Sequence, residues 1–219
     1  MPRLLFEKTG RGVWISHLDL MRLFQRAFKR ADLPLTHTQG FNPRASVSIA
    51  LPLSVGVESA CELLDFELDG QTVSCDEICN RLNNALVDGV RVLEVYETGR
   101  KIRDLSLLHC MVTLEYDAGV PADAQAAMEK LFAQESVIVP KKTKNGIQDQ
   151  NIIPMIRRLS VVSVDPNTTE LDALVCCQNP TLNPAQLALA VEMHLPEYKA
   201  DFTKSRRVEI YDQNENVFR

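Results

Sequence analysis

The stretch that decides the fold runs from Trp14 to Ser59, WISHLDLMRLFQRAFKRADLPLTHTQGFNPRASVSIALPLSVGVES. Its first half places apolar residues at helical spacing, and Ser16 followed by Asp19 three residues later is typical of a capped helix start. We expect the helix to begin after Ser16 and to be stopped by Pro34, because proline cannot continue a helix. Its apolar face is expected to contain Leu20, Leu23, Phe24, Ala27, Phe28 and Ala31.

The segments around this helix complete the first half of the chain. Residues 3–8 are short and apolar and precede a glycine-containing turn, which predicts a strand. Residues 61–70 and 90–97 alternate with period two and predict strands, whereas residues 76–87 return to helical spacing. With an extended segment after the first helix, this is the split β-α-β order of a ferredoxin-like sandwich.

The second half repeats this order of elements. Strands are expected at 105–117, 136–144, 152–165, 169–179 and 206–212, and helices at 121–134 and 183–195. The sequence therefore predicts the α+β class, with tandem ferredoxin-like (split β-α-β) sandwiches in one compact chain. Residues 1–100 would form one half, with the basic helix and the Gln-Gly-Phe-Asn-Pro loop, and residues 101–219 the other.

The composition indicates a globular protein. The chain has 219 residues, of which 45% are hydrophobic, so a sizeable core is available. No apolar run approaches the roughly 20 residues that span a membrane, and the N-terminal segment does not resemble a signal peptide. The six cysteines form no C-x-x-C pair, which favours reduced thiols over a metal site. We expect a cytoplasmic protein with no membrane contact, no cofactor and no metal.

The charge is unevenly distributed. The formal net charge is −5, yet residues 1–50 carry eight Lys or Arg against three Asp or Glu, a surplus of five that leaves −10 for the remainder. A local basic patch on an acidic protein would steer an anion toward one face.

Three arginines concentrate this charge on the predicted helix. Arg22, Arg26 and Arg30 are spaced i, i+4, i+8 and so lie along one face, where guanidinium groups could bind phosphates bidentately. The simpler alternative is a solvated helix face on which Asp19 pairs with Arg22.

His17 and the following loop are the other candidates. A histidine in the first turn meets the positive end of the helix, which favours its neutral form, so His17 could act as a general base or could be structural. In the loop, Gly40 permits an unusual backbone angle, and Phe41 could stack on a base or fill the core. The candidate binding residues are His17, Asp19, Arg22, Arg26, Arg30, Gln39, Gly40, Phe41, Asn42 and Arg44.

The same stretch carries a family resemblance. Ser-His-Leu-Asp, the Arg-rich helix, Leu-Pro, Gln-Gly-Phe-Asn-Pro, Leu-Pro-Leu and Val-Gly-Val-Glu-Ser follow in the order found in the radical-SAM-linked proteins, a bacterial domain encoded beside or fused to a radical SAM protein. This chain has Arg44 where that family usually has His, and Asn183-Pro184 where it usually has Arg-Pro. The resemblance implies a radical SAM partner. No catalytic residue is carried over from it.

These observations lead to three hypotheses about function. The first is a non-catalytic accessory module that binds substrate, most plausibly RNA, for a radical SAM enzyme. The second is an RNA-processing or RNA-modifying enzyme that uses His17 as a general base; the element order also resembles that of CRISPR-repeat RNA-processing endoribonucleases. The third is a protein adaptor whose basic face docks an acidic radical SAM partner.

Overall fold

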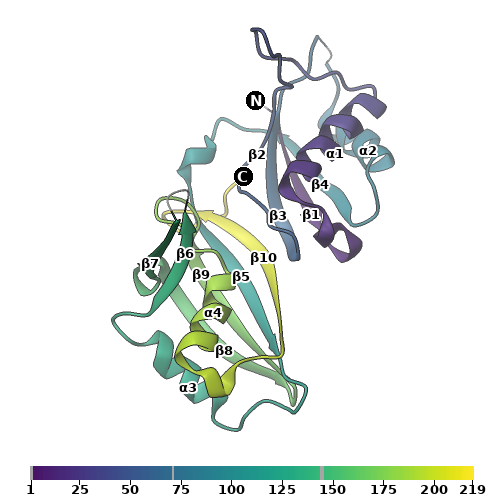
Figure 1. Ribbon diagram of the computed structural model, residues 1–219. Coiled ribbons are helices and arrows are strands. Elements are labelled where there is room, and N and C mark those ends of the chain that lie inside the picture. Colours follow the sequence, from purple (N-terminus) through teal and green to yellow (C-terminus); the bar gives the residue numbers. More distant parts are fainter. Residues whose placement is uncertain (1, 71, 144–145) are drawn as a thin grey trace. The chain divides into compact units, whose positions relative to one another are not determined.

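The computed structural model describes residues 2–70, 72–143 and 146–219, and the chain divides into two compact units. Unit 1 comprises Met1–Ile102 with Arg219, and unit 2 comprises Arg103–Phe218. Each unit combines antiparallel strands with helices (Figure 1). The predicted mixed α+β class is therefore confirmed.

Unit 1 contains the whole of the stretch quoted above. Its elements are β1 (Pro2–Lys8), η1 (Gly10–Trp14), α1 (His17–Arg30), β2 (Val47–Ile49), β3 (Val57–Phe66), α2 (Cys75–Ala85) and β4 (Val90–Glu97), and η2 (Ile102–Asp104) follows. Leu64 of β3 pairs with Leu4 of β1 on one side and with Ile49 of β2 on the other, and β4 pairs with β1. The strand order in this unit is therefore β4-β1-β3-β2.

One apolar layer joins the helices of unit 1 to its sheet. The predicted apolar face of α1 is buried except at Ala31, which caps the helix and is partly buried. Phe6 of β1 contacts Phe24 with ring centroids 4.7 Å apart. Ile78 and Leu82 bring α2 into the same core. Burying this face fixes the orientation of α1, so its opposite, charged face is left to solvent.

Helix α1 ends at Arg30, four residues before Pro34. Asp32 adopts a φ of 54°, and the Leu33 N–H donates to the Phe28 carbonyl at 3.0 Å while the Asp32 N–H donates to the Lys29 carbonyl at 3.3 Å. This is the Schellman pattern, with aspartate in the position that glycine usually occupies. The prediction that Pro34 itself stops the helix was wrong, because the left-handed residue has already turned the chain.

Two cations counted in the basic first segment are buried. The Arg3 Nε donates to Asp65 at 2.5 Å. The Lys8 Nζ donates to the carbonyls of Val13, Ile15 and Ser54 at 3.2, 3.3 and 3.1 Å. Both side chains are fully inaccessible, so they contribute to structure and not to a basic surface.

The turn before α1 is locked by two glycines. Thr9 donates its N–H to the Gly89 carbonyl at 2.9 Å, which brings the backbones at Gly12 and Gly89 together. A Cβ on Gly12 would lie 2.2 Å from the Gly89 carbonyl oxygen, and Gly89 has a φ of +85°. Neither position has room for a side chain.

Unit 2 contains the second half of the chain. Its elements are β5 (Leu105–Glu115), α3 (Ala124–Phe132), β6 (Ile138–Thr143), β7 (Gly146–Asn151), η3 (Ile153–Met155), β8 (Ile156–Asp165), β9 (Thr168–Cys176), α4 (Ala185–His194), η4 (Pro196–Tyr198) and β10 (Phe202–Asp212). The strand order is β10-β5-β9-β8, and β6 pairs with β7 as a separate ribbon. The sequence predicted a polar loop where β7 lies. The predicted end of the preceding strand, Lys144, is outside the described residues.

Candidate functional site

The start of α1 is held by a short polar network. The Ser16 hydroxyl oxygen accepts from the Asp19 N–H at 3.2 Å and donates to the Asp19 carboxylate at 2.8 Å, which confirms the predicted cap. The Asp19 carboxylate also accepts from Arg22 at 3.1 Å. The Ser16 hydrogen bond first, and Arg22 second, lower the pKa of Asp19, so it is ionised at neutral pH. Asp19 therefore contributes a negative charge beside the arginines.

The three predicted arginines have different surroundings. Arg22 pairs with Asp19, and its side chain remains 67% exposed. The Arg26 Nε donates to the Arg22 carbonyl of its own helix at 3.3 Å, and the residue is exposed. Arg30 instead reaches across to α2 and donates to the Ala85 carbonyl at 2.6 Å. Arg22 and Arg26 thus present their charge to solvent, whereas Arg30 also joins two helices.

His17 contacts the segment that precedes β3. Its Nδ1 accepts from the Leu53 N–H at 3.5 Å, a long hydrogen bond. No carboxylate of the described part of the chain hydrogen-bonds to His17, so no orienting acid of the kind found in catalytic dyads accompanies it there. This contact anchors the loop at Leu53 to the first turn of α1.

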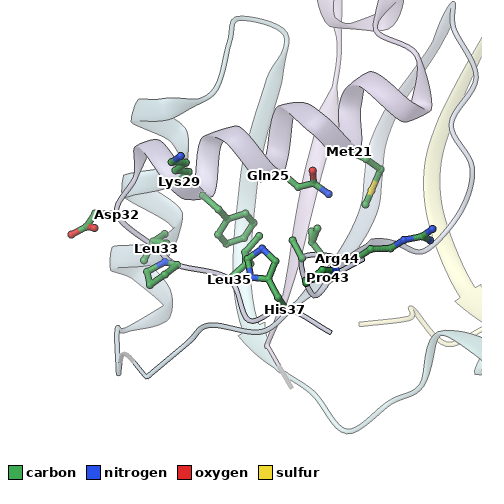
Figure 2. A pocket seen from close by; sticks show the side chains of 13 residues that line it. Met21, Gln25, Lys29, Asp32, Leu33, Leu35, His37, Pro43 and Arg44 are labelled. Carbon is green, nitrogen blue, oxygen red and sulfur yellow. The ribbon is translucent and has the colours of Figure 1, made fainter. Parts of the chain in front are cut away.

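A cavity of about 970 Å³ opens between one flank of α1 and the segment from Leu33 to Val47. Met21, Gln25 and Lys29 line it from the helix at i, i+4, i+8 spacing, and His37 and Arg44 line it from the opposite side (Figure 2). Gln25 and Met21 point from α1 toward the segment that carries His37 and Arg44, whereas Asp32 points away from them. The remaining lining residues are Phe28, Asp32, Leu33, Pro34, Leu35, Pro43, Ala45 and Val47.

The chemistry of this cavity suits an anion with an apolar or aromatic part. Lys29 and Arg44 supply two cations against the single carboxylate of Asp32, while Gln25 and His37 supply hydrogen-bonding groups. The apolar side chains form much of the remaining wall. A concave, partly apolar site with a few polar groups is typical of ligand pockets.

The loop of residues 39–44 is a turn closed at its base. Thr38 donates its N–H to the Arg44 carbonyl at 2.9 Å, and the Thr38 hydroxyl oxygen accepts from the Arg44 N–H at 3.0 Å. Gly40 has a φ of +137°, which justifies glycine there. Phe41 is fully exposed, so the alternative that it fills the core was wrong.

The structure brings together only some of the predicted residues. Arg44 lines the cavity, whereas Gln39, Gly40, Phe41 and Asn42 extend from the turn above it into solvent. Arg22 and Arg26 lie on the neighbouring face of α1 and do not line the cavity. Met21, Gln25 and His37 were not predicted as site residues from the sequence. The sequence shows the helical spacing of Met21, Gln25 and Lys29. It does not show that the segment from Leu33 to Val47 lies opposite this flank of α1.

Other features of the described residues bear on the class of protein. All six cysteines are free thiols, and burial raises the pKa of Cys110 to about 12. No group of three His, Cys, Asp or Glu side chains within residues 2–70, 72–143 and 146–219 is arranged to bind a metal ion. In the same ranges, no helix has both the length and the apolar character needed to cross a membrane.

Comparison with known proteins gives a fold and a family. A chain of the crystal structure of a Cbf5-Nop10-Gar1 complex is similar with a TM-score of 0.56 and 9% sequence identity, over 95% of this chain and 48% of that chain. At this identity the similarity shows the fold alone, and this chain spans about half the length of the other. An unknown protein from Galdieria sulphuraria matches over 94% of this chain and 96% of its own, at 11% identity and a TM-score of 0.26, too low for any argument.

The sequence itself is more informative than these structures. No curated protein is similar enough to count as a relative. Residues 2–184, which include every element from β1 to β9, match the family described as "Uncharacterized protein conserved in bacteria (DUF2344)". The chain belongs to this bacterial family.

Proposed function

We propose that the protein is a non-catalytic accessory module that binds RNA through α1 and the adjoining cavity. The observation that carries the proposal is the grouping of exposed cations on one side of unit 1. Arg22 and Arg26 are exposed along α1, and Lys29 and Arg44 line the cavity beside them. Because the chain beyond residue 50 is acidic, a polyanion would be attracted to this side and repelled elsewhere.

The proposed partner is a radical SAM protein. This proposal rests on the resemblance of residues 14–59 to the radical-SAM-linked proteins, which are encoded beside or fused to such an enzyme. In this arrangement the module would hold the substrate and the partner would perform the chemistry. Mass spectrometry of proteins that copurify with the full chain would test it, and recovery of no radical SAM protein from its native host would contradict it.

The strand orders support a finer description of the fold. Unit 1 has the order β4-β1-β3-β2, and unit 2 has the order β10-β5-β9-β8. In each unit, the first strand along the chain lies beside the last one: β1 beside β4, and β5 beside β10. This is the strand order of a split β-α-β sandwich. We infer that the units are tandem ferredoxin-like halves, with the β6-β7 ribbon inserted into the second.

The geometry at His17 favours binding over catalysis. Its Nδ1 accepts from the Leu53 N–H, a contact that suits a positioning residue. The enzyme hypothesis makes a different prediction, which is that His17→Ala abolishes RNA turnover and spares RNA binding. The module hypothesis expects no RNA turnover by the wild-type protein.

Salt dependence of RNA binding tests the main proposal. For single strands, log Kd changes with log salt concentration by about 0.7 per phosphate contact. The double variant Arg22→Ala/Arg26→Ala should therefore lower the slope by about 1.4 and weaken binding at least tenfold at low salt. The control is Arg103→Ala/Lys130→Ala, which removes two exposed cations from unit 2 and should leave both quantities unchanged. Absent or salt-insensitive RNA binding would contradict the proposal and favour the adaptor hypothesis.

A second variant should change the RNA affinity in the opposite direction. Asp19→Asn removes the carboxylate that pairs with Arg22 but keeps a side-chain oxygen near Ser16. RNA binding should become about two- to fivefold tighter at low salt, since one unfavourable charge is lost and Arg22 is released. If Asp19→Asn weakened binding, the RNA would not lie against this face of α1.

A further inference from the structure

Two large aromatic side chains of unit 1 lie in water. Trp14, the single tryptophan of the chain, is 70% exposed, and Phe41 is fully exposed. Single exposed apolar residues are common on protein surfaces. These two are unusual because both are aromatic and both belong to the segments that flank α1 in the chain, Trp14 before the helix and Phe41 after it.

The positions of the two rings relate them to the proposed binding surface. Trp14 ends η1 and is separated from the first residue of α1 by only two residues. Phe41 lies in the turn whose following residues, Pro43 and Arg44, line the cavity opposite Lys29. Helix α1 has 14 residues, which corresponds to a length of about 21 Å. Its exposed cations from Arg22 to Lys29 span seven residues, or about 10 Å of the helix, a spacing that suits an extended ligand better than a single phosphate group.

The backbone around Trp14 is held in place. Lys8 binds the carbonyls of Val13 and Ile15, the residues on either side of Trp14, and the Gly56 N–H donates to the same Val13 carbonyl at 2.8 Å. The turn is thus pinned to β1 and to the loop before β3. An indole on a fixed backbone is presented to a ligand with little loss of conformational freedom on binding.

We infer that the ligand is single-stranded RNA, whose unpaired bases stack on Trp14 and Phe41 while its phosphates contact Arg22, Arg26, Lys29 and Arg44. This inference rests on the proposed function and specifies its ligand. Stacking on aromatic side chains requires an accessible base face, which a strand without a complement offers and a duplex conceals. The combination of a basic track with aromatic platforms is the usual means of binding single strands without sequence preference.

The single tryptophan makes the inference directly measurable. The full-length protein is titrated with an unstructured oligoribonucleotide of about 12 nucleotides, a length within the usual range of single-strand sites, and with the same strand annealed to its complement. The single strand should quench tryptophan fluorescence and bind at least tenfold more tightly than the duplex. Equal affinities, or binding of the single strand without any change in fluorescence, would overturn the inference while leaving RNA binding itself intact. Failure of both RNAs to bind would overturn the proposed function as well.

Substitutions separate stacking from general effects. Binding of a labelled strand, followed by anisotropy, should weaken about 5- to 150-fold for Trp14→Ala and for Phe41→Ala, the range found for loss of one stacked base. Trp14→Phe keeps an aromatic face and should restore most of the affinity. Phe202→Ala, which removes a 54%-exposed ring from unit 2, is the matched control and should have no effect. Unchanged affinity in both Trp14→Ala and Phe41→Ala would contradict the inference.

Discussion

Replacing Gly89 by alanine should destabilise the protein by about 3–5 kcal/mol, a large part of the stability of an ordinary domain. Two effects add. The φ of +85° is costly for a residue with a side chain, by about 1–2 kcal/mol, and the new Cβ would lie 2.4 Å from the Gly12 nitrogen and 2.6 Å from the Thr9 carbonyl oxygen. Both neighbours are backbone atoms, so relief requires a shift of the turn before α1.

Thermal unfolding followed by circular dichroism measures this effect. For a chain of this size the expected loss corresponds to a fall in Tm of roughly 10 °C. Gly12→Ala should be similarly severe, because its Cβ would lie 2.2 Å from the Gly89 carbonyl oxygen. Gly99→Ala is the matched control, since its Cβ would meet no atom within 4 Å. A Gly89→Ala variant as stable as Gly99→Ala would show that the two backbones do not meet.

The second large effect is expected for Lys8→Met, which keeps most of the side-chain volume and removes the ammonium group. Three carbonyl groups, those of Val13, Ile15 and Ser54, would each lose a hydrogen bond from the Lys8 ammonium group. The Val13 carbonyl still accepts from the Gly56 N–H at 2.8 Å and the Ser54 carbonyl from the Val57 N–H at 3.4 Å, so these two keep a donor. A buried acceptor that loses its partner costs about 1–3 kcal/mol, and relief from burying the charge offsets part of the total. The free energy of unfolding should fall by about 1–3 kcal/mol.

Urea denaturation gives this value, and Lys130→Met supplies the comparison, because Lys130 is exposed on α3 and its replacement should change stability by less than about 0.5 kcal/mol. Lys8→Met should also weaken single-strand RNA binding, since it loosens the backbone on both sides of Trp14. If Lys8→Met were as stable as Lys130→Met, the three carbonyl contacts would be energetically unimportant.

The local pattern of the sequence was sufficient to predict α1 and its start. A buried face and a Ser-x-x-Asp cap depend on residues within a few positions of one another, and both are confirmed. The end of α1 was missed, because a left-handed Asp32 is rarer than a glycine in that role. Strand β7 was missed for a different reason. Its sequence, GIQDQN, is polar and mostly exposed, so it lacks the apolar alternation that marks a half-buried strand.

The candidate site was only partly predictable. The helical spacing of the sequence shows that the cations of α1 share a side of the helix. It does not show which of them are exposed, which line the cavity and which contact another helix, because these surroundings depend on residues far away in sequence. Arg30 contacts Ala85, 55 residues later, and Lys8 contacts Ser54, 46 residues later. No local pattern distinguishes these side chains from free surface cations. The positive charge of residues 1–50 therefore appeared larger in the sequence than the charge that the surface presents.

The exposure of Trp14 has a spectroscopic consequence. An indole that is 70% accessible in the folded protein already has nearly the hydration it will have in the unfolded chain. The emission maximum should therefore lie at the long wavelength of a solvated indole and shift little when urea is added. Tryptophan emission therefore reports the folding of this protein poorly. Because the indole is accessible in the folded state, the same emission should respond strongly to any ligand that covers the ring.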